Sequence, residues 1–274
     1  MPSFTTSDGV RLDYVVDDFT DPWRTAPVLV LLHSAMGCKD RFFSWIPALA
    51  RDFRVLRLDL RGHGRSQVPG ESTELSIDRL KRDVLEFLDV AGVSQAHFAG
   101  ASAGGYLAMR LAMDHPERVR SLGLYGSTPG FKGGQAPKWL PQIRAKGFRA
   151  FLAETISDRF PIGQCDPRLV EWFLDQAGSN DVPFVTRFIA LMDQQDWSSE
   201  LGKITCPTLL VIPGAGKIGD YAGFDRMRAS IPDIEVKTYE GAPHNVWDFM
   251  AERCVADLKD FIERRFGKSR PGDA

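Results

Sequence analysis

The segment 94–115 most strongly constrains the fold, because a strand pattern and a helix pattern meet there at one serine. An apolar stretch leads into the run Gly100-Ala101-Ser102-Ala103-Gly104, and apolar residues then recur at helical spacing until Pro116. A turn this sharp requires small residues around Ser102, because strand and helix approach each other closely. Gly100, Gly104 and Gly105 satisfy that requirement. The segment therefore predicts a strand, a tight turn that exposes Ser102, and a helix.

Strand and helix patterns alternate along most of the chain. Further strands are predicted at 10–16, 26–32, 53–59, 119–125, 207–213 and 234–239, and helices at 42–51, 76–91 and 247–266. The stretch 26–32 is continuously apolar, which is typical of a parallel strand covered on both faces. This alternation predicts an α/β fold with a mostly parallel sheet.

The strand pattern stops between residues 128 and 200, where aromatic-rich helical segments take over. We interpret 129–199 as a helical cap, or lid, inserted after the sixth strand into a core formed by 1–128 and 200–274. The aromatic residues of this segment either line a substrate pocket or fix the cap to the core; they are Trp139, Phe148, Phe151, Phe160, Trp172, Phe173, Phe184, Phe188 and Trp197.

Composition excludes several classes of function. The net charge is −2, and no basic run with interleaved aromatic residues suggests nucleic-acid binding. The longest apolar run, 28–32, is too short to span a membrane, and the first residues lack the pattern of a signal peptide. We therefore expect a cytoplasmic protein that acts on a small molecule, and we leave its oligomeric state open, a homodimer included.

Four cysteines are scattered through the chain without a metal-binding spacing: Cys38, Cys165, Cys206 and Cys254. No histidine is spaced from any of them as in a metal-binding motif, so the sequence indicates neither a zinc site nor a disulfide framework. The motifs of this chain imply no metal and no cofactor.

Three further motifs accompany the turn at Ser102. Residues 30–37 read VLLHSAMG, residues 59–66 read DLRGHGRS, and residues 241–244 read GAPH. Together with the turn they resemble the α/β-hydrolase fold family with a cap domain, over nearly the whole chain. The resemblance implies a mostly parallel eight-stranded sheet flanked by helices.

Acyl transfer needs a nucleophile, a base and donors for a developing oxyanion. Ser102 is the candidate nucleophile, and His244, on the loop after the last strand, is the candidate base. The backbone N–H of Ala103 and, by resemblance, that of Ala35 would form the oxyanion hole. The candidate substrate-binding residues are His33, Ser34 and Trp139.

The third member of a catalytic triad departs from the family pattern. Gly216 and Lys217 occupy the positions where the family usually carries an acid, and the first carboxylate in this loop is Asp220. Two alternatives stay open. Either Asp220 reaches His244 as the triad acid, or it caps a helix that begins at Tyr221 and the acid is absent.

The serine at the turn excludes two classes within the resemblance, because epoxide hydrolases and haloalkane dehalogenases use aspartate there. The form with a single cap resembles 3-oxoadipate enol-lactonases and hydrolases of aromatic ring-fission products. We expect a serine hydrolase that cleaves an ester or lactone through an acyl-enzyme. The alternatives are a carbon–carbon bond hydrolase, a lyase or cofactor-free oxygenase on this fold, or a ligand-binding protein with an incomplete triad.

The first part of the predicted cap is basic. Residues 131–153 contain five basic residues and no acidic one. The basic residues are Lys132, Lys138, Arg144, Lys146 and Arg149. This charge suits a carboxylate-bearing substrate, and it equally suits a solvated face.

Overall fold

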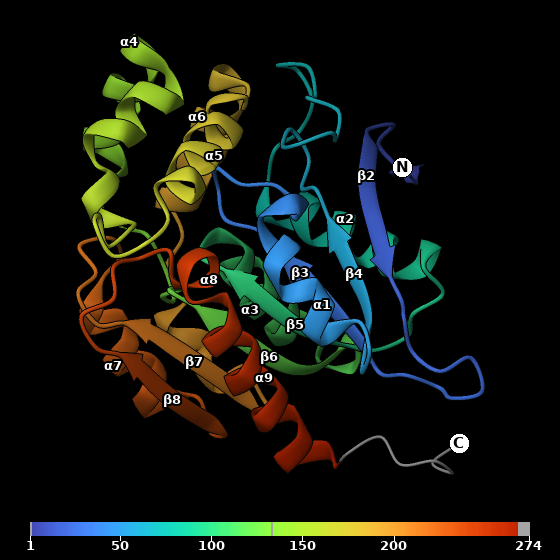
Figure 1. The fold of residues 1–274 in the computed structure, drawn as a ribbon. Coiled ribbons are helices and arrows are strands. Elements are labelled where there is room, and N and C mark those ends of the chain that lie inside the picture. The colour runs from blue at the N-terminus through green and yellow to red at the C-terminus, as the bar shows by residue number, and fades with distance from the viewer. Residues whose placement is uncertain (1, 133, 268–274) are drawn as a thin grey trace.

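The computed structural model describes residues 2–132 and 134–267, which form an eight-stranded sheet between two layers of helices (Figure 1). The sheet order is β1-β2-β4-β3-β5-β6-β7-β8. β1 and β2 pair antiparallel, β2 pairs antiparallel with β4, and all remaining neighbours are parallel. The strands are β1 Ser3–Thr5, β2 Arg11–Asp17, β3 Val28–Leu32, β4 Arg54–Leu58, β5 Ala96–Ala101, β6 Val119–Tyr125, β7 Thr208–Pro213 and β8 Ile234–Tyr239. The predicted mostly parallel sheet flanked by helices is confirmed.

The central strands are buried on both faces because their apolar side chains alternate between two cores. In β3, Val30 and Leu32 join one core, whereas Leu29 and Leu31 join the other. The first core includes side chains of α2 (Ile77–Val90) and α3 (Ala103–Asp114), and the second includes side chains of α1 (Ile46–Leu49) and α9 (Ala251–Phe266).

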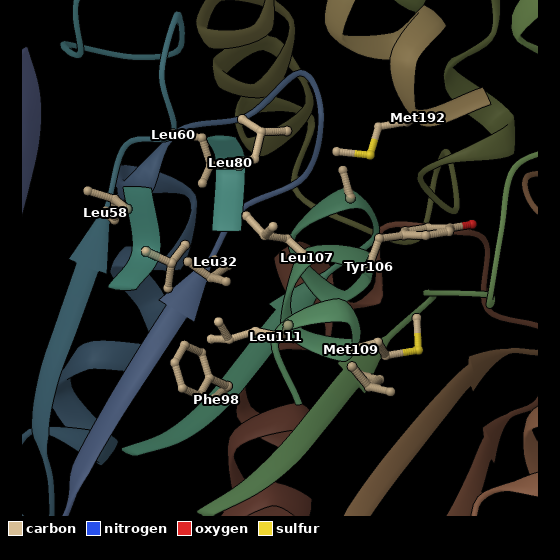
Figure 2. Close-up of a cluster of buried hydrophobic side chains, with 14 of the residues drawn as sticks. Leu32, Leu58, Leu60, Leu80, Phe98, Tyr106, Leu107, Met109, Leu111 and Met192 are labelled. Atoms are coloured by element: carbon tan, nitrogen blue, oxygen red, sulfur yellow. The ribbon is translucent and has the colours of Figure 1, made fainter. Parts of the chain in front are cut away.

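Packing beneath α3 holds the helix that begins at the serine turn. Figure 2 shows Leu107 and Leu111 of α3 beside Leu32 and Phe98, which come from β3 and β5. All four side chains are almost completely buried. Well-packed interiors deform little, so α3 is a rigid base for the turn.

Three helices lie between β6 and β7 in the sequence and pack on one another at one end of the sheet (Figure 1). They are α4 (Ala136–Glu154), α5 (Pro167–Gly178) and α6 (Val182–Asp193). An antiparallel bridge between Gly130 and Asp196 brings the start and the end of this segment side by side. The predicted helical character of 129–199 is confirmed; the division of the chain into a core and a cap stays a prediction.

The structure differs from the sequence predictions at three places. The helix predicted at 42–51 is divided between a 3₁₀ helix, η1 (Lys39–Trp45), and the short helix α1. The Lys39 and Arg41 side chains of η1 bind buried carboxylates. The closing helix is split at Met250 into α8 (Val246–Phe249) and α9. The three-residue strand β1 was not predicted, because so short a segment carries no detectable alternation.

Helix α7 (Tyr221–Ser230) begins at Tyr221, as one alternative predicted. Within the described ranges, no helix combines the length and apolar character needed to cross a membrane. Residues 268–274, the end of the predicted core, lie outside the described residues.

Candidate active site

Ser102 occupies the turn between β5 and α3 in a rare backbone conformation. Its φ of 47° and ψ of −114° make it the only non-glycine residue with positive φ in the described part of the chain. Such a conformation is strained and persists only where neighbours enforce it. The Ser102 N–H donates to the Tyr125 carbonyl at 2.9 Å, and the Ser102 carbonyl accepts from Ser127 Oγ at 2.9 Å. These bonds tie both sides of the turn to the end of β6.

Close backbone contacts explain the glycines around Ser102. A Cβ atom on Gly104 would lie 2.1 Å from the Leu32 carbonyl oxygen, and one on Gly100 would lie 2.4 Å from the Gly105 nitrogen. Neither contact is possible for a larger residue without moving backbone. The predicted need for small residues on both sides of the serine is confirmed.

A cavity of about 630 Å³, part of it open to solvent, brings most of the predicted site residues together. Ser102, His244, Ala35, Ser34 and Trp139 all line it. The remaining walls are mostly apolar and come from Met36, Phe131, Ala136, Arg159, Phe173, Ile189, Met192, Ile218, Asn245 and Trp247.

Ala103 is fully buried and opens α3 directly after the nucleophile. The first N–H groups of a helix have no acceptor within it, so the Ala103 N–H is available to an oxyanion. Its predicted partner Ala35 is held by its carbonyl oxygen, which lies 2.7 Å from His63 Nε2. The oxyanion-hole assignment stays a prediction that this arrangement permits.

His244 lies on the loop after β8. Asp158, in the predicted cap, binds the backbone of this loop. The backbone N–H of His244 donates to the Asp158 carbonyl at 3.1 Å, and the His244 ring packs edge-on against Trp247. Burial, together with the smaller effect of the Arg159 charge, lowers the pKa of His244 to about 3. The imidazole is therefore neutral at pH 7, the form that accepts a proton. No hydrogen bond joins it to Ser102 in the described residues; in enzymes without substrate such bonds are often long.

The contact predicted between Asp220 and His244 is absent. Asp220 instead caps α7, where it accepts from the Ala222 N–H at 3.1 Å, and it forms an ion pair with Arg226. Among the described residues His244 Nδ1 is buried without a hydrogen-bond partner. The capping alternative is the correct one, because the N-terminal N–H groups of α7 and a nearby guanidinium satisfy the carboxylate locally.

The end of β6 offers no substitute acid. Gly126 stands there with φ of 60°, and a Cβ atom on it would lie only 3.3 Å from His244 Nδ1. A side chain at this position would therefore strain the backbone and displace the imidazole by a few tenths of an ångström. The described residues place no carboxylate in contact with His244.

Replacing Asp220 with asparagine is expected to leave kcat for an activated ester within about two-fold of the parent. A triad aspartate changed to asparagine lowers kcat by about 10⁴ in a serine protease, so steady-state kinetics separate the two roles clearly. Asp225→Asn, on the exposed side of the same helix, is the matched control. A loss of a hundred-fold or more in Asp220→Asn alone would restore Asp220 as the acid.

His33 does not line the cavity, contrary to the prediction that it binds substrate. The ring is fully buried, with Nδ1 2.8 Å from the Ser34 carbonyl and Nε2 accepting from the Leu60 N–H at 3.0 Å. Burial holds the pKa of His33 well below its usual range. Both ring nitrogens are used, so His33 fixes the loops after β3 and β4 rather than contacting a ligand.

The basic stretch of the predicted cap faces solvent. All five of its cations are exposed, and none lines the cavity. Lys146 pairs with Glu154, and Arg149 pairs with Glu171 and Asp175. The solvated-face alternative therefore describes this stretch.

Of the nine aromatic residues predicted to line a pocket or hold the cap, only Trp139 and Phe173 reach the cavity. The Cys38 thiol is buried, and burial raises its pKa to about 12, so it is a packing residue and not a second nucleophile. Sequence reasoning missed Arg159, the one arginine or lysine that lines this cavity in the described residues.

Comparisons with known proteins match this architecture. The family model described as the alpha/beta hydrolase fold matches residues 27–249. The pimeloyl-[acyl-carrier protein] methyl ester esterase of Aeromonas hydrophila is 30% identical over 249 residues, which are 86% of this chain and 95% of that protein. Bifunctional epoxide hydrolase 2 of Sus scrofa is 41% identical over 118 residues, but this match covers 42% of this chain and only 20% of the relative.

Solved structures give the same result over the whole fold. A hydrolase from Pseudomonas aeruginosa superposes with a TM-score of 0.84 at 28% identity and covers 95% of this chain and 97% of its own. The enol-lactonase of Burkholderia xenovorans superposes with a TM-score of 0.85 at 23% identity and covers 95% and 99%. The match of the family model, together with a relative 30% identical over nearly its whole length, shows that the chain belongs to the alpha/beta hydrolase fold family.

Proposed function

We propose that this chain is a serine hydrolase that cleaves a small ester or lactone through an acyl-enzyme. One observation carries the proposal: Ser102, held at positive φ above the start of α3, shares one largely apolar cavity with the neutral imidazole of His244. Ala35, in the cavity wall, and Ala103, next to the serine, would supply the backbone N–H groups that bind the oxyanion.

The residues have complementary roles in the proposed reaction. Ser102 Oγ attacks the substrate carbonyl while His244 accepts the hydroxyl proton, and the two backbone N–H groups bind the oxyanion. The C–O bond to the leaving group then breaks, and the imidazolium protonates that group. Water then attacks the acyl-enzyme and gives a proton to His244, which passes it to Ser102 Oγ as the acyl bond breaks, so that the acid and free Ser102 are released.

The lining of the cavity supports a small substrate. Its walls are mostly apolar with a few polar groups, which is typical of small-molecule pockets. The relatives also favour an ester or lactone as substrate. One of them is a methyl ester esterase, and one of the similar structures is an enol-lactonase.

Labelling with a fluorophosphonate and acyl-enzyme burst kinetics test this proposal. We expect the probe to modify Ser102, as located by peptide mass spectrometry, and p-nitrophenyl acetate to give a burst of one nitrophenolate per protein. Labelling without turnover would indicate a binding protein. No labelling, together with proton abstraction from a ring substrate, would indicate the lyase or oxygenase alternative.

The pH dependence of kcat/KM tests whether His244 works as a base with a lowered pKa and without a neighbouring carboxylate. Because His244 has a pKa of about 3, it stays neutral as the pH falls through 6.5, and kcat/KM for a neutral ester is expected to stay constant between about pH 8 and 5. A histidine with its ordinary pKa of about 6.5 would instead lose most of its base form over that interval. A midpoint near 6.5, measured where circular dichroism shows the fold intact, would contradict this.

A further inference from the structure

Arg159 is a buried cation at the wall of the candidate active site. It follows the short 3₁₀ helix η3 (Ile156–Asp158), its exposed fraction is 3%, and it lines the same cavity as Ser102 and His244. The loop that carries His244 holds its backbone, since the Asn245 N–H donates to the Arg159 carbonyl at 3.1 Å. The backbone of Arg159 is thus fixed relative to the loop that carries the proposed base, His244.

The guanidinium has few partners for so buried a group. Nη1 donates to the Thr155 carbonyl at 3.2 Å and to Thr155 Oγ1 at 2.9 Å. No carboxylate lies within ion-pair distance of it in the described residues, and Nε and Nη2 have no acceptor there. Buried Arg41 and Arg61, by contrast, pair with carboxylates. An arginine carries five N–H donors in a planar fork, so most of this donor set is free for a ligand.

Aromatic side chains hold the fork in place. The guanidinium carbon of Arg159 lies 5.5 Å from the ring centre of Trp139 and 5.9 Å from that of Phe151. Burial lowers the pKa of Arg159 to about 10, although the charge of Asp158 opposes this shift, so the group remains protonated at neutral pH. A buried charge without a counter-ion is costly, and an anionic ligand would remove that cost.

We propose that Arg159 binds a free carboxylate of the substrate, so that the natural ester or lactone carries a second, unreacted carboxylate group. The proposal rests on the proposed function for the bond that is cleaved, but not for the binding of the anion. A planar guanidinium matches a carboxylate with two parallel hydrogen bonds. A single cation among apolar walls suits one negative charge better than a phosphate dianion.

Such a carboxylate would also act on His244. Arg159 disfavours the protonated imidazole, which has no carboxylate of the protein beside it. A substrate carboxylate paired with Arg159 offsets this charge and favours the imidazolium that forms when Ser102 attacks. An anionic substrate is therefore expected to have a higher kcat, and not only a lower KM, than its neutral analogue.

A matched pair of esters tests the inference: mono-p-nitrophenyl glutarate, which has a free carboxylate, and its methyl ester, which has none. We expect the unmodified protein to prefer the anionic ester in kcat/KM, and Arg159→Gln to reduce that preference by about 100-fold, the usual scale for losing one partner of a buried charge pair. Arg144→Gln removes the same charge from the exposed part of α4 and is expected to keep the preference within about two-fold. Equal kcat/KM for both esters in the unmodified protein would overturn the inference while leaving the serine-hydrolase proposal intact.

A binding measurement needs neither turnover nor a variant. By calorimetry, glutarate is expected to bind the unmodified protein at least about ten-fold more tightly than dimethyl glutarate, a difference of about 1.4 kcal/mol. Equal binding would overturn the inference even if Arg159→Gln failed to fold. If the fluorophosphonate does not react and no ester is cleaved, the proposed function fails, while selective glutarate binding would still support Arg159 as an anion site.

Discussion

Ser102→Ala is expected to lower kcat for p-nitrophenyl acetate by about 10⁴-fold or more, as serine-to-alanine changes do in serine proteases. Alanine has no hydroxyl to attack the carbonyl, so no acyl-enzyme forms and the burst disappears. The oxyanion donors and the cavity remain, so the residual rate reports what they contribute without a nucleophile. Stopped-flow release of nitrophenolate measures both the burst and the steady-state rate.

The control for this change is Ser179→Ala, which removes an exposed hydroxyl from the end of α5. It is expected to keep the burst and the fluorophosphonate label. Circular dichroism should show Ser102→Ala folded, since alanine and serine occupy nearly the same volume. A Ser102→Ala protein that retains more than about a tenth of the parent rate would refute Ser102 as the nucleophile.

Lys39→Met is expected to lower the free energy of unfolding by about 3–5 kcal/mol, the usual result of removing one partner from a buried ion pair. The Lys39 side chain is fully buried, and its ammonium lies 2.6 Å from a carboxylate oxygen of both Asp13 and Asp59. Burial alone would lower the pKa of Lys39, but hydrogen bonds to these carboxylates raise it, so the ammonium is charged at neutral pH. Methionine removes the buried cation between these two carboxylates and leaves Asp13 with the half-exposed Arg11 at 3.9 Å.

Urea unfolding followed by circular dichroism measures this loss. Lys203→Met is the matched control, because its ion pair with Glu200 is more than half exposed on the lysine side and is expected to contribute less than about 1 kcal/mol. A loss below 1 kcal/mol for Lys39→Met would mean that water or rearrangement relieves the two carboxylates. The change also bears on the site, since Asp59 binds the Arg65 N–H in the same loop as His63.

Local pattern was sufficient to predict the sheet and the serine turn. The strands β6 and β8 have the ends that the sequence predicts. The first is almost completely buried, whereas the second is a partly buried edge strand that begins with alternating apolar and polar residues. Ser102 was identified for a similar reason, since the glycines required by its close contacts stand beside it in the sequence. These features depend on neighbours a few residues away.

Which residues belong to the site depends on contacts between distant parts of the chain, and the spacing of residues in the sequence does not reveal these contacts. Asp220 stands in the loop where the family carries its acid, but its carboxylate binds an N–H group in the first turn of its own helix instead of His244. His33 resembled a site residue because it adjoins the loop of Ala35, but the Leu60 N–H used its ring. Arg159 follows Asp158 in an unremarkable polar stretch, and only the fold places it in the cavity.

The bridge between Gly130 and Asp196 means that the two ends of the helical segment meet where they leave and rejoin the sheet. β6 and β7 are neighbours in the sheet, so a shorter connection between the same two points would leave their pairing unchanged. The walls contributed by Trp139, Phe173 and Met192 belong to that segment, whereas Ser102 and His244 do not. The carbonyls of Asp158 and Arg159, in the same segment, accept from the N–H groups of His244 and Asn245, so a transplanted segment would have to keep these two acceptors for His244 to stay in place while the surrounding walls change.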